Sequence, residues 1–80
     1  MTRSEILGKL QEIFVDLLED EGLQLSEESS AKTIPDWDSL LHITLMASVE
    51  DEFDIQIPTD EIAQTKDVKT LVDIIERELK

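Results

Sequence analysis

Three side chains that can take part in catalysis lie close together near the middle of the sequence: Asp38, Ser39 and His42. A serine hydroxyl beside a histidine and a carboxylate is the usual arrangement of an activated nucleophile, and Ser39 and His42 are one helical turn apart. The glycine-flanked nucleophile turn of many hydrolases is missing, however, and no second segment supplies an orienting carboxylate or an oxyanion hole. A small hydrolase is therefore the weakest hypothesis, and we expect that the protein is not an enzyme.

Ser39 has two other interpretations. Its hydroxyl can support the start of a helix as a cap, or it can be the attachment point of a covalently bound group. His42 is expected at the edge of the hydrophobic core, as a structural residue rather than a catalytic one.

The many acidic residues form no recognisable metal site. A calcium loop over residues 17–28 would place Gly22 and Glu28 correctly, but its first position is Leu17 instead of an aspartate. Zinc binding is not expected of a chain with one histidine and no cysteine. The acidic run at residues 19–21 is interpreted as solvated surface.

The elements that must position Ser39 are helices. Apolar residues recur at spacings of three and four, which predicts an all-α fold: a small bundle of three main helices plus one short helix. The expected helices run from about Ser4 to Leu18, from Asp38 or Ser39 to about Glu52, over residues 59–64, and onward from Asp67. A long loop (residues 20–35) joins the first and second helices, and residues 1–80 are expected to form a single domain.

Individual residues are expected to cap these helices or to bury apolar side chains. Ser4 is the expected cap of the first helix, and Thr59 or Asp60 that of the short one. Leu23 and Leu25 are expected to anchor the long loop. The core face of the last helix is expected to consist of Val68, Leu71, Val72, Ile75 and Leu79.

The second helix carries two apolar strips when its residues are placed about 100° apart. One is an ordinary core stripe made of Leu45, Met46, Val49 and Phe53. The other, called here the docking strip, consists of Leu40, Ile43 and Ala47. Glu50 and Asp51 lie near its far end. The docking strip either packs against another helix or is an exposed surface with an acidic border that binds a partner.

The charge balance restricts the classes of partner. Twenty acidic residues against seven basic ones give a net charge of -13, which disfavours nucleic acid and suits a basic protein partner. No apolar run approaches the ~18 residues of a membrane-spanning helix, so no membrane association is expected. The absence of cysteine suits a reducing compartment, and we expect a cytoplasmic monomer.

The order of features along the whole chain resembles the acyl carrier proteins and the related peptidyl carrier domains. Asp38, Ser39 and Leu40 resemble the family's attachment motif at the start of the second helix. The segment VEDEFDIQIP at residues 49–58 resembles the end of that helix and the loop that follows it. The three-residue motif recurs by chance, but its combination with this downstream segment at the proper distance is specific.

The resemblance implies a function and a cofactor. In the family a serine hydroxyl is esterified to the phosphate of 4′-phosphopantetheine, which a phosphopantetheinyl transferase delivers from coenzyme A. The thiol of this arm carries acyl or aminoacyl groups as thioesters. By position, Ser39 is the attachment residue, and Asp38 supports the transfer by helping to position the transferase's magnesium. The alternative function is a helical bundle that binds proteins non-covalently and whose serine stays unmodified.

The resemblance also implies partners. Besides the transferase, these are enzymes that load, transfer or condense acyl or aminoacyl groups and that dock through basic surfaces. The expected contacts are the docking strip, Glu50 and Asp51.

The sequence departs from the usual family pattern at four positions near the motif. Asp36 stands where glycine is common, and Trp37 directly precedes the motif. Leu41 and Thr44 stand where carriers of fatty acid synthesis usually have acidic residues, and both are expected to face solvent or a partner. These differences favour a stand-alone carrier of a specialised pathway over housekeeping fatty acid synthesis.

Overall fold

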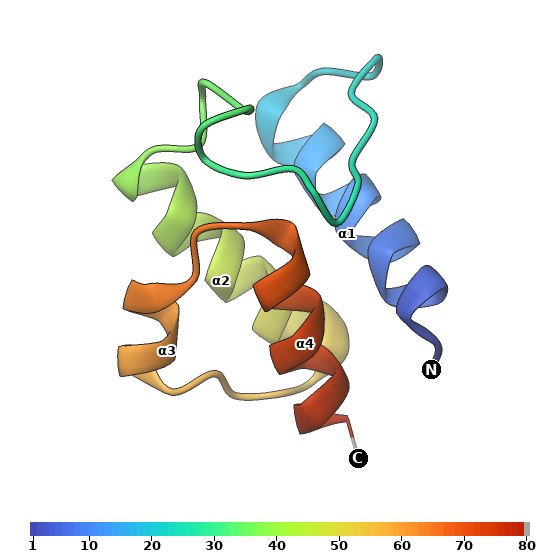
Figure 1. Cartoon of the computed structure of the whole chain (residues 1–80), viewed down its shortest axis with the longest axis vertical. Coiled ribbons are helices and arrows are strands. Elements are labelled where there is room, and N and C mark those ends of the chain that lie inside the picture. The colour runs from blue at the N-terminus through green and yellow to red at the C-terminus, as the bar shows by residue number, and fades with distance from the viewer. Residues whose placement is uncertain (80) are drawn as a thin grey trace.

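The structure is a computed structural model that describes residues 1–79. It contains four helices: α1 (Arg3–Leu18), α2 (Ser39–Phe53), α3 (Thr59–Gln64) and α4 (Val68–Glu78) (Figure 1). The predicted all-α fold with three main helices and one short helix is confirmed. Within the described residues, the one β pairing is an isolated bridge between Ser30 and Asp67. Figure 1 shows the long connection between α1 and α2 crossing one end of the bundle.

The hydrophobic core is built by α1, α2 and α4 together with the loops. The buried helix residues are Ile6, Leu10 and Phe14 from α1, Leu45, Met46, Val49 and Phe53 from α2, and Val68, Leu71, Val72, Ile74 and Ile75 from α4. The predicted core stripe of α2 is therefore confirmed. Each large apolar side chain that is buried in this way stabilises the fold by about 1.5–3 kcal/mol.

The last turn of α4 differs from the prediction. Leu79 was expected on the core face, but the helix ends at Glu78 and the Leu79 side chain is 38% exposed. The spacing of the apolar residues is correct for Leu79, but the bundle no longer covers that face at the end of the helix. Leu79 is therefore a terminal cap position and contributes little to the core.

Side chains cap the three main helices. The Thr2 hydroxyl accepts the Glu5 N–H, and the Glu5 carboxylate accepts the Thr2 N–H. These two hydrogen bonds form a capping box and lower the pKa of Glu5. Asp67 caps α4 by accepting the Thr70 N–H at 2.8 Å, and the Thr70 side chain together with this N–H lowers the pKa of Asp67. The prediction that Ser4 caps the first helix is wrong, because α1 already begins at Arg3 and Ser4 lies within its first turn.

The short helix α3 is attached to the bundle rather than built into it. Pro58 precedes it without a side-chain cap, so the prediction of a Thr59 or Asp60 cap is wrong. Pro58 is tolerated at this position because its backbone is extended (φ -56°, ψ 140°) and the N–H that it lacks would have no intrahelical acceptor. None of the residues of α3 is fully buried, although Ile62 packs against the core. Arg77 of α4 holds α3 from outside through two hydrogen bonds to the Glu61 carboxylate, at 2.7 and 2.5 Å, which lower the pKa of Glu61.

The long loop between α1 and α2 is fixed by hydrogen bonds to both of its neighbours. The Gln11 side chain of α1 donates to the Leu23 carbonyl and accepts the Leu25 N–H at 2.6 Å. Near the start of α4, the Ser29 carbonyl accepts the Val68 N–H at 2.9 Å. Leu25 is buried and Leu23 is half-buried, so both predicted anchors pack against the core. The loop therefore has one defined path into the start of α2.

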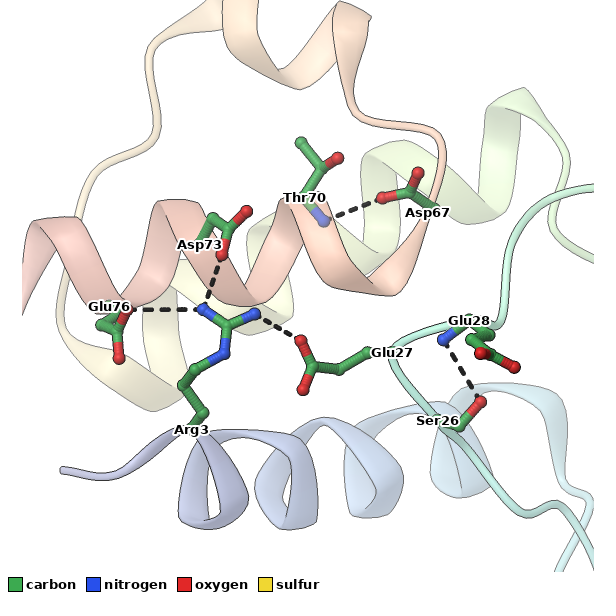
Figure 2. Close-up of polar contacts among 8 residues, drawn as sticks. All are labelled: Arg3, Ser26, Glu27, Glu28, Asp67, Thr70, Asp73 and Glu76. Atoms are coloured by element: carbon green, nitrogen blue, oxygen red, sulfur yellow. Dashed lines mark hydrogen bonds and ion pairs between the residues drawn. The ribbon is translucent and has the colours of Figure 1, made fainter.

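Arg3 joins three segments at one end of the bundle (Figure 2). Its guanidinium donates to Glu27 of the long loop and to Asp73 (2.5 Å) and Glu76 (3.4 Å) of α4. The hydrogen bonds with Glu27 and Asp73 raise the pKa of Arg3 above its usual value. Partly exposed ion pairs stabilise little when they stand alone. In a chain of net charge -13, however, this cation also offsets the mutual repulsion of three carboxylates.

Candidate functional site

Ser39 is presented at the first position of α2 by the residue before it. Asp38 has an extended backbone, and its carboxylate accepts the Leu41 N–H at 2.9 Å, so Asp38 is the N-cap. The Ser39 side chain is exposed. The interpretation of Ser39 as the helix cap is therefore wrong, and its hydroxyl is left free for another use.

The first turn of α2 also offers free backbone donors. Helices begin with N–H groups that lack an intrahelical acceptor. Within residues 1–79, the N–H groups of Ser39 and Leu40 meet no protein acceptor, whereas Asp38 takes that of Leu41. Unpaired N–H groups and the helix dipole favour an anionic group, such as a phosphate, at this end of the helix.

Both ring nitrogens of His42 take part in hydrogen bonds within the protein. Its Nδ1 accepts the indole N–H of Trp37 at 3.0 Å, and its Nε2 lies 2.7 Å from the Ile62 carbonyl oxygen. An indole N–H can only donate and a carbonyl can only accept, so the imidazole is neutral with its hydrogen on Nε2. Both ring nitrogens are occupied, and neither is free to take a proton from Ser39. His42 is half-buried at the core edge, as predicted, and this arrangement argues against the hydrolase hypothesis.

An open groove of about 450 Å³ runs beside Ser39, between α2 and the end of α3. It is lined by Ala31, Trp37, Asp38, Ser39, His42, Ile43, Ala63, Thr65 and Lys66. The sequence analysis missed the contributions of Ala31, Ala63, Thr65 and Lys66. No local pattern identifies them, because only the path of the loop and the attachment of α3 bring them to Ser39.

The docking strip is exposed. Leu40 is 75% exposed and Ile43 is 67% exposed, and Ala47 is also exposed. Of the two alternatives from the sequence, packing against another helix is thus excluded within the described bundle. A solvent-facing row of apolar side chains beside carboxylates is typical of a protein-binding surface.

The two acidic residues at the far end of the docking strip differ in their surroundings. Asp51 is exposed. Glu50 is half-buried, and its carboxylate accepts the Ile57 N–H at 2.8 Å. Glu50 therefore has a structural task, which is to hold the loop after α2, in addition to any contact with a partner.

The prediction for Leu41 and Thr44 is correct for only one of them. Thr44 is exposed, and its hydroxyl donates to the Leu40 carbonyl. Leu41 is half-buried and packs against the core, so the prediction that it faces solvent is wrong. An angular position just outside the core stripe still reaches the bundle when the side chain is as long as that of leucine. Of the four positions that favour a specialised pathway, Leu41 therefore no longer supports it, and the specialised pathway stays a prediction.

The described residues meet neither the requirements of a metal site nor those of a membrane-spanning helix. Among residues 1–79, no three His, Cys, Asp or Glu side chains are grouped so that they could hold a metal ion. No helix in the described part of the chain is long and apolar enough to cross a membrane.

Residues 8–75 match the model of the family described as "Phosphopantetheine attachment site". The chain belongs to this family. It is 35% identical over 77 residues to the acyl carrier protein of Porphyromonas gingivalis, an alignment that covers 96% of this chain and 99% of the relative. It is 33% identical over 75 residues to that of Thermosynechococcus vestitus, with 94% and 93% covered.

Two solved structures of acyl carrier proteins share the fold. The holo protein from Geobacter metallireducens superposes with a TM-score of 0.83 and 34% identity, covering 91% of this chain and 84% of the other. The protein from Thermotoga maritima gives a TM-score of 0.84 and 31% identity, covering 96% and 89%. The resemblance inferred from the sequence is confirmed: the protein is an acyl carrier protein, and its cofactor is covalently attached 4′-phosphopantetheine.

The start of α2 suits this cofactor. The Ser39 hydroxyl is exposed and uncommitted, which a phosphodiester link requires. The free N–H groups of Ser39 and Leu40 lie next to it, and the open groove leaves room for the arm along the surface. Proteins of this family carry substrates for other enzymes and do not transform them.

The Asp38 cap can be tested by replacing it. Asp38→Ala should lower the free energy of unfolding by about 1 kcal/mol, because the Leu41 N–H loses its acceptor, whereas Asp38→Asn should stay close to the wild type because asparagine caps equally well. Urea unfolding followed by circular dichroism measures both. Equal stabilities of the alanine and asparagine variants would contradict the assignment of Asp38 as the N-cap.

Proposed function

We propose that Ser39 is the residue that carries the 4′-phosphopantetheine arm and that the chain delivers acyl or aminoacyl groups as thioesters on it. The observation that supports this most directly is the free, exposed hydroxyl of Ser39 at the first position of α2. Ser39 also lies inside the region that matches the phosphopantetheine attachment family.

In this proposal each neighbouring residue has a separate task. Asp38 takes over the capping of α2, so that the Ser39 hydroxyl does not have to turn back onto the helix. The N–H groups of Ser39 and Leu40 stabilise the negative charge of the phosphodiester. The arm supplies a thiol, and the tether raises the effective concentration of the cargo at each partner enzyme. The chain itself catalyses no step.

Partner enzymes are proposed to dock on the strip formed by Leu40, Ile43 and Ala47. These are the transferase and the enzymes that load, transfer or condense acyl or aminoacyl groups. Asp51 and Glu50 would meet basic groups of the partner, and the net charge of -13 would steer the encounter. Asp38 is proposed to help the transferase to position its magnesium ion.

Residues 1–80 are proposed to act as one carrier domain. A single hydrophobic core, shared by α1, α2, α4 and the loops, supports this reading. The cytoplasmic location and the monomeric state stay predictions, which fractionation and light scattering can check.

The attachment site is tested with coenzyme A, magnesium and a broad-specificity phosphopantetheinyl transferase, followed by intact-mass measurement. The wild type should gain the mass of the arm, and Ser39→Ala should gain none although it folds normally. Asp38→Asn keeps the cap but lacks the charge, so it should be modified at least tenfold more slowly at unchanged stability. A wild type that stays unmodified would favour the non-covalent bundle, and a modified Ser39→Ala protein would place the arm elsewhere.

The docking surface is tested by adding one charge to it. Ile43→Asp should weaken binding to the transferase at least fivefold, because it places a carboxylate within the apolar strip. Gln56→Asp adds the same charge to an exposed position beyond the other end of α2, which is 15 residues or about 22 Å long, and it should bind almost normally. Surface plasmon resonance measures both.

Association should also slow as salt rises, since the Debye length falls from about 30 Å at 0.01 M to about 8 Å at 0.15 M. If Ile43→Asp binds as the wild type does and salt has no effect, the strip is not the docking surface.

A further inference from the structure

We propose that the hydrogen-bonded group of Trp37, His42 and Ile62 closes the seam between α2 and α3, so that this carrier holds short cargo in the open groove and does not bury long alkyl chains. This inference rests on the proposed attachment at Ser39 and specifies the class of cargo. It assigns a role to Trp37 and His42, which the attachment motif itself does not explain.

A long alkyl cargo tethered at Ser39 would be driven towards the hydrophobic core. Burial of methylene groups is favourable, and the arm begins at the mouth of the groove. The groove lies between His42 and Ile43 on α2 and Ala63 on α3. The short way from Ser39 to the core therefore leads between α2 and α3, where α3 contributes no fully buried side chain of its own.

That way is closed by two hydrogen bonds in series. The His42 Nε2–H donates to the Ile62 carbonyl of α3 at 2.7 Å, and the Trp37 indole donates to His42 Nδ1 at 3.0 Å. The Trp37 ring lies against the imidazole, with the two planes 28° apart. Trp37 also contacts Phe14 of α1, with ring centroids 5.3 Å apart in an edge-to-face arrangement. The link thus runs from α3 through α2 to the centre of the core.

An alkyl chain that entered here would have to break this link. Trp37 is only 6% exposed, so separation from His42 would leave a buried indole N–H without an acceptor, which is costly. The core beneath is formed by fully buried side chains, and a close-packed interior has to open a cavity before it can accept an additional chain. The free energy needed to open the cavity offsets most of the free energy gained by burying methylene groups. The additional cost of the broken hydrogen bonds then makes entry of the chain unfavourable.

The surface of the groove is largely apolar, so it suits a short acyl group that covers part of this surface without entering the core. Thr65 is 2% exposed, and its hydroxyl is already used to donate to the Glu61 carbonyl at 2.7 Å, which seals the α3 side of the wall. Lys66 is an exposed cation at the rim. Ala31 and Ala63 are small and leave space between these groups. A short acyl or aminoacyl group can lie here with its polar atoms in contact with water.

The experiment compares the protein loaded by the transferase from acetyl-coenzyme A with the protein loaded from decanoyl-coenzyme A. Intact mass first establishes that each sample carries its arm and cargo. If the wild type gains no 4′-phosphopantetheine, both the proposed function and this inference are contradicted. For the loaded wild type, the two forms should melt within about 1 °C of each other, because the decanoyl chain stays outside the core.

Variants of the seam test the role of the hydrogen bonds. In Trp37→Phe/His42→Ala the link is removed without leaving an unpaired indole, and the decanoyl form should melt about 4 °C or more above the acetyl form, the shift expected for modest burial in a domain of this size. His42→Gln has both a donor and an acceptor and should behave as the wild type does.

Two results would overturn the inference. In the first, the melting temperature of the wild type rises from the acetyl to the decanoyl form as much as that of the double variant. In the second, the melting temperature of the double variant does not rise from the acetyl to the decanoyl form. If the double variant does not fold, amide and indole hydrogen exchange on the wild type decides: unchanged protection of Trp37 and of α3 between the acetyl and decanoyl forms supports closure, and altered protection contradicts it.

Discussion

The arrangement of the site depends on one imidazole. His42 accepts from Trp37 in the loop and donates to Ile62 in α3, while its own backbone belongs to α2. It therefore joins the end of the long loop and the more distant α3 to the first turns of α2. Without this residue, α3 would be held mainly by Ile62 in the core and by the ion pair of Glu61 with Arg77.

A second constraint is the charge of the chain. In a chain with a net charge of -13, the few basic side chains form ion pairs that connect separate segments. Arg3 ties α1 to the long loop and α4, and Arg77 ties α4 to α3. The docking strip and Asp51 remain exposed on α2, where a basic partner is proposed to bind. In the proposed function, the same acidity also supplies the field that steers a basic partner towards the chain.

The sequence predicts those features that depend on local periodicity. The four helices and the core stripe of α2 follow from apolar spacing, and the family follows from the motif at Ser39 together with residues 49–58. The predictions from sequence are wrong where the tertiary structure determines which of several nearby residues caps a helix or reaches the core. Thr2 rather than Ser4 caps α1, and Leu41 reaches the core despite its angular position.

The partners of His42 and the groove residues Thr65 and Lys66 could not be predicted, because they depend on how α3 and the long loop approach α2. Likewise, a pattern of carboxylates near the docking strip does not reveal that Glu50 also holds the Ile57 N–H. The sequence predicts Ser39 as the attachment residue, and the tertiary structure defines the space around this side chain.

The most direct test of this account is the nitrogen-15 NMR spectrum of the His42 ring in the folded protein at neutral pH. The account predicts a single neutral tautomer, with the hydrogen on Nε2, an unprotonated Nδ1, and a Trp37 indole hydrogen that exchanges slowly with water. A ring protonated at Nδ1, or one that averages between tautomers while the indole exchanges freely, would contradict the account.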